Sequence, residues 1–189
     1  MRFPSRSLVL VSAFLVACGG GSDTTEPNNT ACLGAAPKGT MTATVNGAAF
    51  TAAFIAQATI QNSTASGFNT VQVNGVSCPA SGAFVGRQII ITLGRNTPIT
   101  TGTYQLGLSS QQQPPQSAYS GIGTVSLAPN IWTTVDAAGV GSGSITFTTI
   151  TATRLAGTFQ LVGAPASSND AANKTALTIT GGAFDVNVP

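Results

Sequence analysis

The sequence predicts an all-β domain, an antiparallel meander of about ten short strands that forms a β-sandwich or a flattened β-barrel. Three observations support this prediction. Threonine, valine, isoleucine and phenylalanine recur in short runs from Met41 onwards, and glycine, asparagine and proline interrupt those runs. No sustained helical period follows the apolar segment near the N-terminus. The sequence leaves open which of the two closures is formed.

The expected strands share β-branched or aromatic residues and turn residues at their ends. They are Met41–Val45, Ala48–Ile60, Phe68–Val73, Gln88–Leu93, Thr103–Leu108, Tyr119–Leu127, Ile131–Val135, Ser144–Ile150, Arg154–Val162, Lys174–Ile179 and Ala183–Val188. The pair Asn46-Gly47 predicts a hairpin, because both residues tolerate positive φ. A second pair, Asn74-Gly75, is expected to end the run that begins at Phe68.

Alternate residues of these runs predict the core. They include Ile89, Ile91, Leu93, Tyr104, Leu106, Ile122, Val125, Leu127, Ile145, Phe147, Leu155, Phe159, Leu161, Leu177, Ile179, Phe184 and Val186. Asp185 alternates outward between the last two. The sequence GTYQL at 102–106 recurs as GTFQL at 157–161. We interpret this echo as similar hairpin chemistry rather than as a duplication.

The N-terminus has the pattern of an export signal. Arg2 and Arg6 precede an apolar run at residues 8–17, which is shorter than the roughly 20 residues of a membrane-spanning helix. The run ends in the letters LVAC, which resemble the bacterial lipobox. This resemblance implies cleavage before Cys18 and attachment of diacylglycerol to its sulfur. Gly19 in place of aspartate implies sorting to the outer membrane, where two or more acyl chains anchor firmly.

The chain therefore divides into a signal peptide at 1–17, a lipidated cysteine with a flexible tether at 18–39, and a single β domain at 40–189. Lys and Arg number 7 and Asp and Glu number 5, and removal of Arg2 and Arg6 leaves 7 − 2 = 5 positive side chains. A balance of 5 and 5 offers no basic patch for phosphates, so nucleic acid is not an expected partner. The expected location is that of an exported, membrane-anchored lipoprotein of the outer membrane, on either its periplasmic or its surface face.

Two further sets of residues are candidates for specific roles. Cys32 and Cys78 remain if Cys18 is acylated, and an oxidising compartment favours a disulfide between them, with two free thiols as the alternative. Trp132, Tyr104 and Tyr119 are candidate ligand or partner contacts, although core packing is the ordinary use of such residues.

The inventory of reactive groups predicts that the chain is not an enzyme. It contains no histidine, which removes Ser-His-Asp and Cys-His catalysis and the usual zinc ligands. The β region holds only Asp136, Asp170 and Asp185 as carboxylates, and the first two lie in turn-like stretches. Lys38 and Lys174 lack a serine three residues earlier. We therefore expect no catalytic residue, no metal and no cofactor.

Several segments together resemble a family of uncharacterised β-rich bacterial lipoprotein domains that follow a lipobox signal. These segments are MTATVNG at 41–47, GTYQL at 102–106, GSITFT at 143–148, GTF at 157–159 and LTITG at 177–181. Phe50 stands where tryptophan is expected in that family, and Gly181-Gly182 where Asn-Gly is usual. The resemblance implies a periplasmic or surface β domain and brings no catalytic residues.

These observations favour a lipid-anchored, non-enzymatic structural or interaction module of the cell envelope, with an envelope protein as its partner. The first alternative is a periplasmic β-barrel whose cavity binds a small apolar or lipid ligand. The two differ at the inward positions, which would be filled by packed side chains in the module and would line a cavity in the barrel. A hydrolase is the remote alternative.

Overall fold

The computed structural model describes residues 39–63, 68–77, 87–107, 119–127, 130–135, 141–166 and 175–189. Within these ranges the chain forms strands and no helix, and all strand pairs are antiparallel, which confirms the predicted fold class. The strands are β1 (Gly39–Val45), β2 (Ala48–Thr51), β3 (Ile55–Ser63), β4 (Phe68–Val76), β5 (Gln88–Arg95), β6 (Gly102–Leu106), β7 (Tyr119–Leu127), β8 (Asn130–Thr133), β9 (Ser142–Ile150), β10 (Arg154–Pro165) and β11 (Leu177–Asn187). The described residues include no helix long and apolar enough to cross a membrane.

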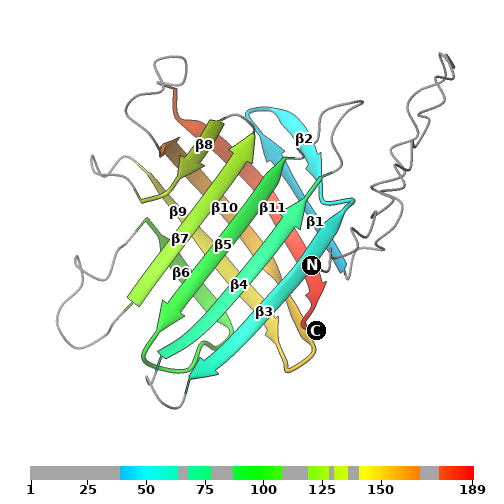
Figure 1. Ribbon diagram of the computed structural model, residues 1–189, viewed down its shortest axis with the longest axis vertical. Helices are drawn as coiled ribbons and strands as arrows, with labels where there is room; N and C mark the ends of the chain where they lie inside the picture. Colours follow the sequence, from blue (N-terminus) through cyan, green and yellow to red (C-terminus); the bar gives the residue numbers. More distant parts are fainter. Residues whose placement is uncertain are drawn as a thin grey trace, which may run out of the picture.

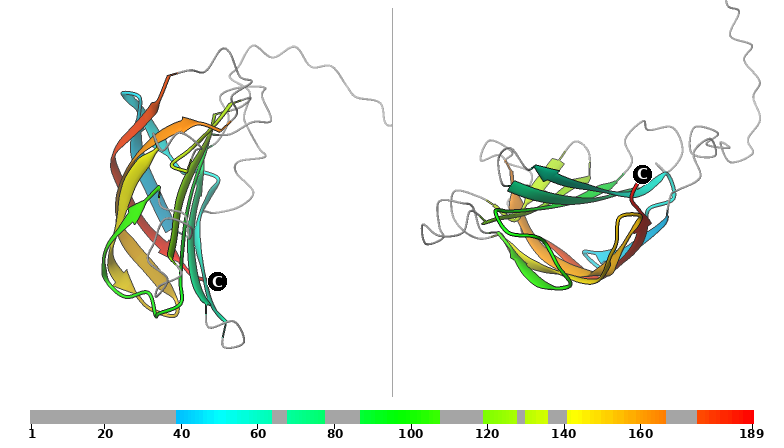
Figure 2. Two further views of the ribbon diagram at one scale, coloured as in Figure 1. Left: turned by 90° about the vertical axis from the view of Figure 1, so that its left-hand side faces the viewer. Right: turned by 90° about the horizontal axis from the view of Figure 1, so that it is seen from below.

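One hydrogen-bonded sheet folds over into two facing layers (Figures 1 and 2). Layer A has the order β2-β1-β11-β10-β9-β6, and layer B has the order β8-β7-β5-β4-β3. Strand β10 belongs to both, because Leu155–Val162 pairs with β9 whereas Ala164–Pro165 pairs with β8. A second link between the layers lies just after β6, at the edge of layer A, where the Gly107 N–H donates to the Gly121 carbonyl of β7 at 2.8 Å.

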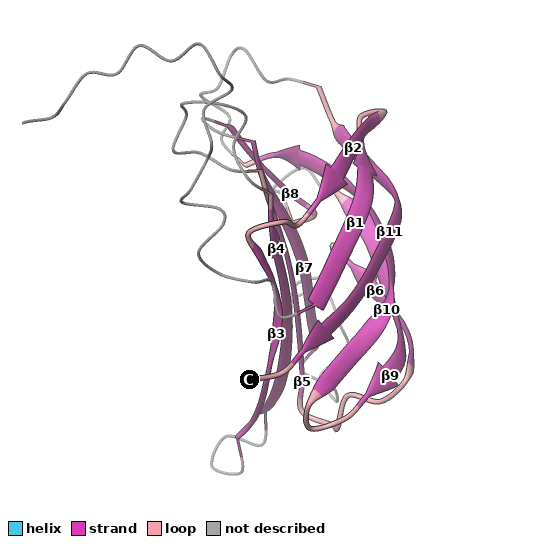
Figure 3. Ribbon diagram, turned by 90° about the vertical axis from the view of Figure 1, so that its right-hand side faces the viewer, coloured by secondary structure: helices cyan, strands magenta, loops and turns pink. Residues whose placement is uncertain are grey.

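The opposite side of the molecule stays open. Within the described residues no strand pair joins β3 to β1 or β2, so the two ends of the sheet face each other across a seam (Figure 3). The fold is therefore a flattened barrel that is closed on one side only. It departs from a simple meander at β6, which crosses from layer B to layer A and pairs with β9 before β7 returns beside β5.

The core lies between the layers and joins them. Inward side chains from both layers form one contiguous buried cluster, and Phe147, Met41, Ile89, Ile91 and Leu155 are among its fully buried members. Its aromatic centre runs through layer A, where the ring of Phe147 packs edge-on against Tyr104 and Phe184 with centroids 5.9 and 5.8 Å away. The predicted inward positions on β5, β9, β10 and β11 are confirmed by this burial.

The first hairpin forms as predicted, and the second Asn-Gly pair does not. Asn46 and Gly47 adopt φ of 45° and 83°, which is the mirror-image turn that suits two-residue hairpins. Asn74 and Gly75 instead continue β4, paired with β3 and β5. Gly75 faces inward, and a methyl group there would overlap the sulfur of Met41. The glycine is a packing position rather than a turn position, so the predicted strand end is wrong.

Two other strand boundaries differ from the prediction. The run Ala48–Ile60 is broken at residues 52–54, where the chain passes from β2 in layer A to β3 in layer B. The two expected C-terminal strands are one strand, β11, which continues through Gly181 and Gly182. Both neighbours of β11 shift register there, which identifies a β-bulge, and Gly181 has the positive φ of 59° that such a bulge favours.

Candidate functional site

The repeated sequence GT-aromatic-QL flanks one strand of layer A. Strand β9 pairs with the first copy in β6 and with the second copy in β10. The register is the same on both sides, since Ile145 lies between Tyr104 and Phe159. The hairpin interpretation holds for the second copy and is wrong for the first, because β6 pairs with β9 and not with the strand that precedes it.

This shared register builds an uncharged patch on the outer face of layer A, which we call the β9 patch. It consists of two cross-strand rows of outward side chains, Thr103–Thr146–Thr158 and Gln105–Ser144–Gln160. The hydroxyls of Thr103 and Thr146 lie 2.9 Å apart in a hydrogen bond. The aromatic and leucine residues of the same motif alternate inward to the core. One motif thus supplies both the core and the patch.

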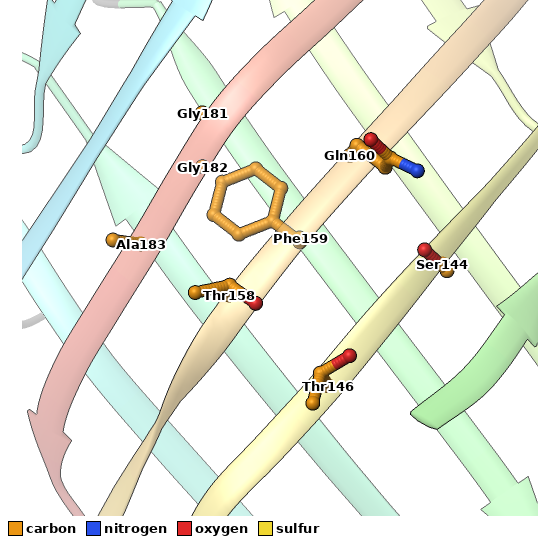
Figure 4. Close-up of a pocket in the computed structure, with 8 residues that line it drawn as sticks. All are labelled: Ser144, Thr146, Thr158, Phe159, Gln160, Gly181, Gly182 and Ala183. Carbon is orange, nitrogen blue, oxygen red and sulfur yellow. The ribbon is translucent and has the colours of Figure 1, made fainter. Parts of the chain in front are cut away.

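A shallow depression of about 410 Å³ extends from this patch towards β11. Ser144, Thr146, Thr158 and Gln160 line it on one side, and Gly181, Gly182 and Ala183 line it on the other. Figure 4 shows the polar side chains on β9 and β10 beside the bare backbone of β11. The hollow lies at the bulge. It is open there because this part of β11 carries no side chain larger than a methyl group.

Among the described residues, the outer face of layer A carries one ion pair, between Arg154 and Asp185. Arg154 on β10 donates two hydrogen bonds to Asp185 on β11, from Nε at 2.7 Å and from a terminal nitrogen at 2.5 Å. Hydrogen bonding to Arg154 lowers the pKa of the Asp185 carboxyl, and hydrogen bonding to Asp185 raises the pKa of Arg154. The pair is solvent-exposed, so water screens much of the attraction.

The arrangement can hold a partner by hydrogen bonds to neutral groups. The backbones of Ser144, Thr158 and Gln160 are paired in the sheet, but within the described residues their side chains have no hydrogen-bond partner, so these hydroxyl and amide groups are available to a ligand. A hydroxyl donates and accepts, and an amide does both at separate atoms. These groups suit peptide backbone or sugar hydroxyls. On the described part of this face the only charges are those of Arg154 and Asp185, and they neutralise each other.

The aromatic residues singled out from the sequence lie in different surroundings. Trp132 on β8 is 7% exposed and donates from its ring nitrogen to the Thr175 carbonyl at 3.2 Å. Tyr104 is 9% exposed, and its hydroxyl donates to the Thr100 carbonyl at 2.8 Å and accepts from the Thr100 N–H at 3.0 Å. The backbone of Tyr119 pairs with Arg95 at the start of β7. Trp132 and Tyr104 are therefore both buried residues of the core, whereas the side chain of Tyr119 lies outside what the structure describes.

Tyr104 has a structural role at a chain reversal. Its ring lies beneath the guanidinium of Arg95, 5.4 Å from the ring centroid. Burial raises the pKa of its hydroxyl, but the hydrogen bonds to Thr100 and the charge of Arg95 lower this pKa more, and the net shift is downward. The two hydrogen bonds to Thr100 fix the segment that connects β5 to β6.

The remaining candidates lie outside the described residues. These are the cysteines Cys18, Cys32 and Cys78, and the charged residues Lys38, Lys174, Asp136 and Asp170. Asp185 does point outward between Phe184 and Val186, as predicted. The described ranges hold no group of three or more histidine, cysteine or acidic residues that could bind a metal. Sequence reasoning missed the β9 patch, although the echo in the sequence was its signal.

No protein-family model, curated protein or solved structure matches the chain.

Proposed function

We propose that the chain is a lipid-anchored lipoprotein of the bacterial cell envelope that acts as a non-enzymatic interaction module. The observation that carries this proposal is the lipobox-like sequence ending at Cys18, followed by a tether and a β domain. The resemblance to uncharacterised β-rich lipoprotein domains supports the same assignment. Gly19 favours the outer membrane as the site of the anchor.

The packing of the domain favours an interaction module over a ligand-binding barrel. The inward positions that would line a cavity in such a barrel are occupied by one contiguous cluster of buried apolar side chains. The side-chain groups of Ser144, Thr158 and Gln160 lie instead on the outer face, where they line the depression. A partner held at this surface would be an envelope protein or another neutral polymer that offers hydrogen-bonding groups.

The anchor is tested by metabolic labelling in a bacterial host. We expect the wild-type chain to incorporate an azide-tagged palmitate and to sediment with membranes. The substitution Cys18→Ser should abolish both, because the thioether bond needs the cysteine sulfur, whereas Cys32→Ser should retain both. An unlabelled wild-type chain in the soluble periplasmic fraction would overturn the lipoprotein assignment.

The contact surface is tested by photo-crosslinking in living cells. A benzophenone amino acid at Thr158 lies in the depression, and the same residue at Thr70 lies on the outer face of layer B as the matched control. We expect discrete crosslinked bands from position 158 and none from position 70. Bands of equal intensity at both positions, or at 70 alone, would contradict the assignment of the β9 patch.

A further inference from the structure

Within the described residues, strand β3 is an edge strand that lacks the usual protection against pairing. It ends the strand order of layer B, and within the described part of the chain only β4 pairs with it. Its nine residues run in unbroken register with β4, with no bulge. The sequence IAQATIQNS contains no charged residue and no proline. Natural proteins protect long edges with such residues, with bulges or with a covering segment.

The other edges of the sheet contrast with β3. Strand β2 ends layer A with four residues only. Strand β6 has five residues, and the Gly107 N–H just beyond it is bonded to β7. Every second residue of an edge strand directs its N–H and C=O groups away from its one neighbour. Strand β3 is therefore the longest template for strand addition in the described fold.

The sequence of β3 is complementary to itself in antiparallel orientation. A two-fold axis through Thr59 would place Thr59 opposite Thr59 of a second copy, and Gln57 opposite Gln61 of that copy. These residues share the outer face of layer B, where Gln57 and Thr59 are half-buried and Gln61 is exposed. Threonine–threonine pairs and amide pairs are favourable across antiparallel strands, and no like charges meet.

We infer that two copies of this chain dimerise by pairing their β3 strands antiparallel about Thr59. This pairing joins the two B layers into one continuous sheet and is isologous, as two-fold dimers require. A single strand pair buries less area than a standard interface of roughly 1,600 Å², so we expect a Kd of about micromolar order. The inference goes beyond the proposed function and does not depend on the lipid anchor.

Disulfide trapping of the purified full chain in mild detergent tests the geometry. Directly opposed residues of an antiparallel pair have Cα atoms about 4.5–5.5 Å apart, which suits a disulfide. We expect Thr59→Cys to give a reducible dimer under mild oxidation, well above the background of the wild-type cysteines. The control Thr51→Cys places the thiol on β2 at the other end of the sheet and should add nothing. Dimer from Thr51→Cys alone, or from neither variant, would overturn the proposal.

Charge substitution provides the second test, with sedimentation velocity as the readout and circular dichroism as the folding check. We expect the wild-type chain to show a concentration-dependent monomer–dimer equilibrium. Thr59→Lys and Thr59→Glu should each be monomeric, because like charges would lie directly opposite one another. An equimolar mixture of the two should dimerise again. A mixture that stays monomeric, or a Thr59→Lys chain that dimerises as well as wild type, would contradict pairing through β3.

Discussion

At the scale of single residues, Thr134 shows how a side chain replaces a missing strand contact. It follows β8, is 1% exposed and is the buried polar residue of the described core. Its N–H donates to the Gly123 carbonyl at 2.8 Å, and its hydroxyl accepts from the Gly123 N–H at 2.9 Å. The hydroxyl thus extends the pairing of β7 beyond the end of β8, where the two layers separate.

We therefore expect Thr134→Val to destabilise the fold by about 1–3 kcal/mol, because the buried Gly123 N–H would lose its acceptor while the volume of the side chain is kept. Thr124→Val on the outer face of β7 is the matched control and should change stability by less than about 0.5 kcal/mol. Urea unfolding monitored by fluorescence gives both values. Equal stability of the two variants would show that the Thr134 hydroxyl is not needed.

The pair of Arg154 and Asp185 predicts a specific pH dependence. Hydrogen bonding to Arg154 lowers the pKa of Asp185 in the folded state. The pair therefore stabilises the fold above the ordinary carboxyl pKa, near pH 4, and this contribution is lost as the pH falls through the lowered value. Thermal unfolding of wild type and Asp185→Asn should show a stability difference at pH 6 that shrinks below about pH 4. A constant difference would argue against the pair.

At the scale of elements, the bulge in β11 determines the shape of the candidate site. Gly181 has a φ of 59°, and a Cβ built there would meet no other atom within 4 Å. Backbone conformation, rather than space, therefore selects glycine at this position. A left-handed conformation costs an ordinary residue roughly 1–2 kcal/mol, asparagine tolerates it best and β-branched residues tolerate it least.

Substitutions at the bulge should therefore follow a defined order. We expect Gly181→Asn to cost less than about 1 kcal/mol and Gly181→Val to cost about 2 kcal/mol. Ala183→Val, on the same face of the same strand, should be neutral because Ala183 does not have a positive φ. Chemical denaturation of the three variants measures the order. Equal costs for asparagine and valine would mean that β11 adopts another conformation here.

The elements also show what sequence patterns can and cannot predict. The alternation of apolar residues predicted the inward faces of β5, β9 and β10, because burial of one face repeats every two residues. Asn46-Gly47 predicted its hairpin because the signal is local. Asn74-Gly75 did not form a turn, because both residues pair with β3 and β5, and the glycine leaves space for Met41 from a distant part of the chain. The β9 patch could not be predicted either, because it also depends on a contact between distant parts of the chain. Strand β6 pairs with β9 and not with β5, the strand that precedes it.

At the scale of the whole molecule, a single core connects the two layers. Phe147 and Leu155 of layer A belong to the same buried cluster as Ile91 and Val73 of layer B. Strand β10 also runs through both layers. The layers should therefore unfold together, because separating them exposes the inner faces of both. This prediction can be measured, since the only tryptophan, Trp132, lies in layer B.

Ile145→Val removes a buried methyl group from layer A, and Ile91→Val removes one from layer B, each at an expected cost of about 0.5–1.5 kcal/mol. If the domain unfolds in one step, each substitution shifts the midpoint measured by tryptophan fluorescence by the same amount as the midpoint measured by circular dichroism. Fluorescence reports on Trp132, whereas circular dichroism reports on all strands. A fluorescence midpoint that responds to Ile91→Val but not to Ile145→Val would mean that layer B is stable without layer A. The open seam beside β3 would then be a boundary between two folding units rather than a gap in one.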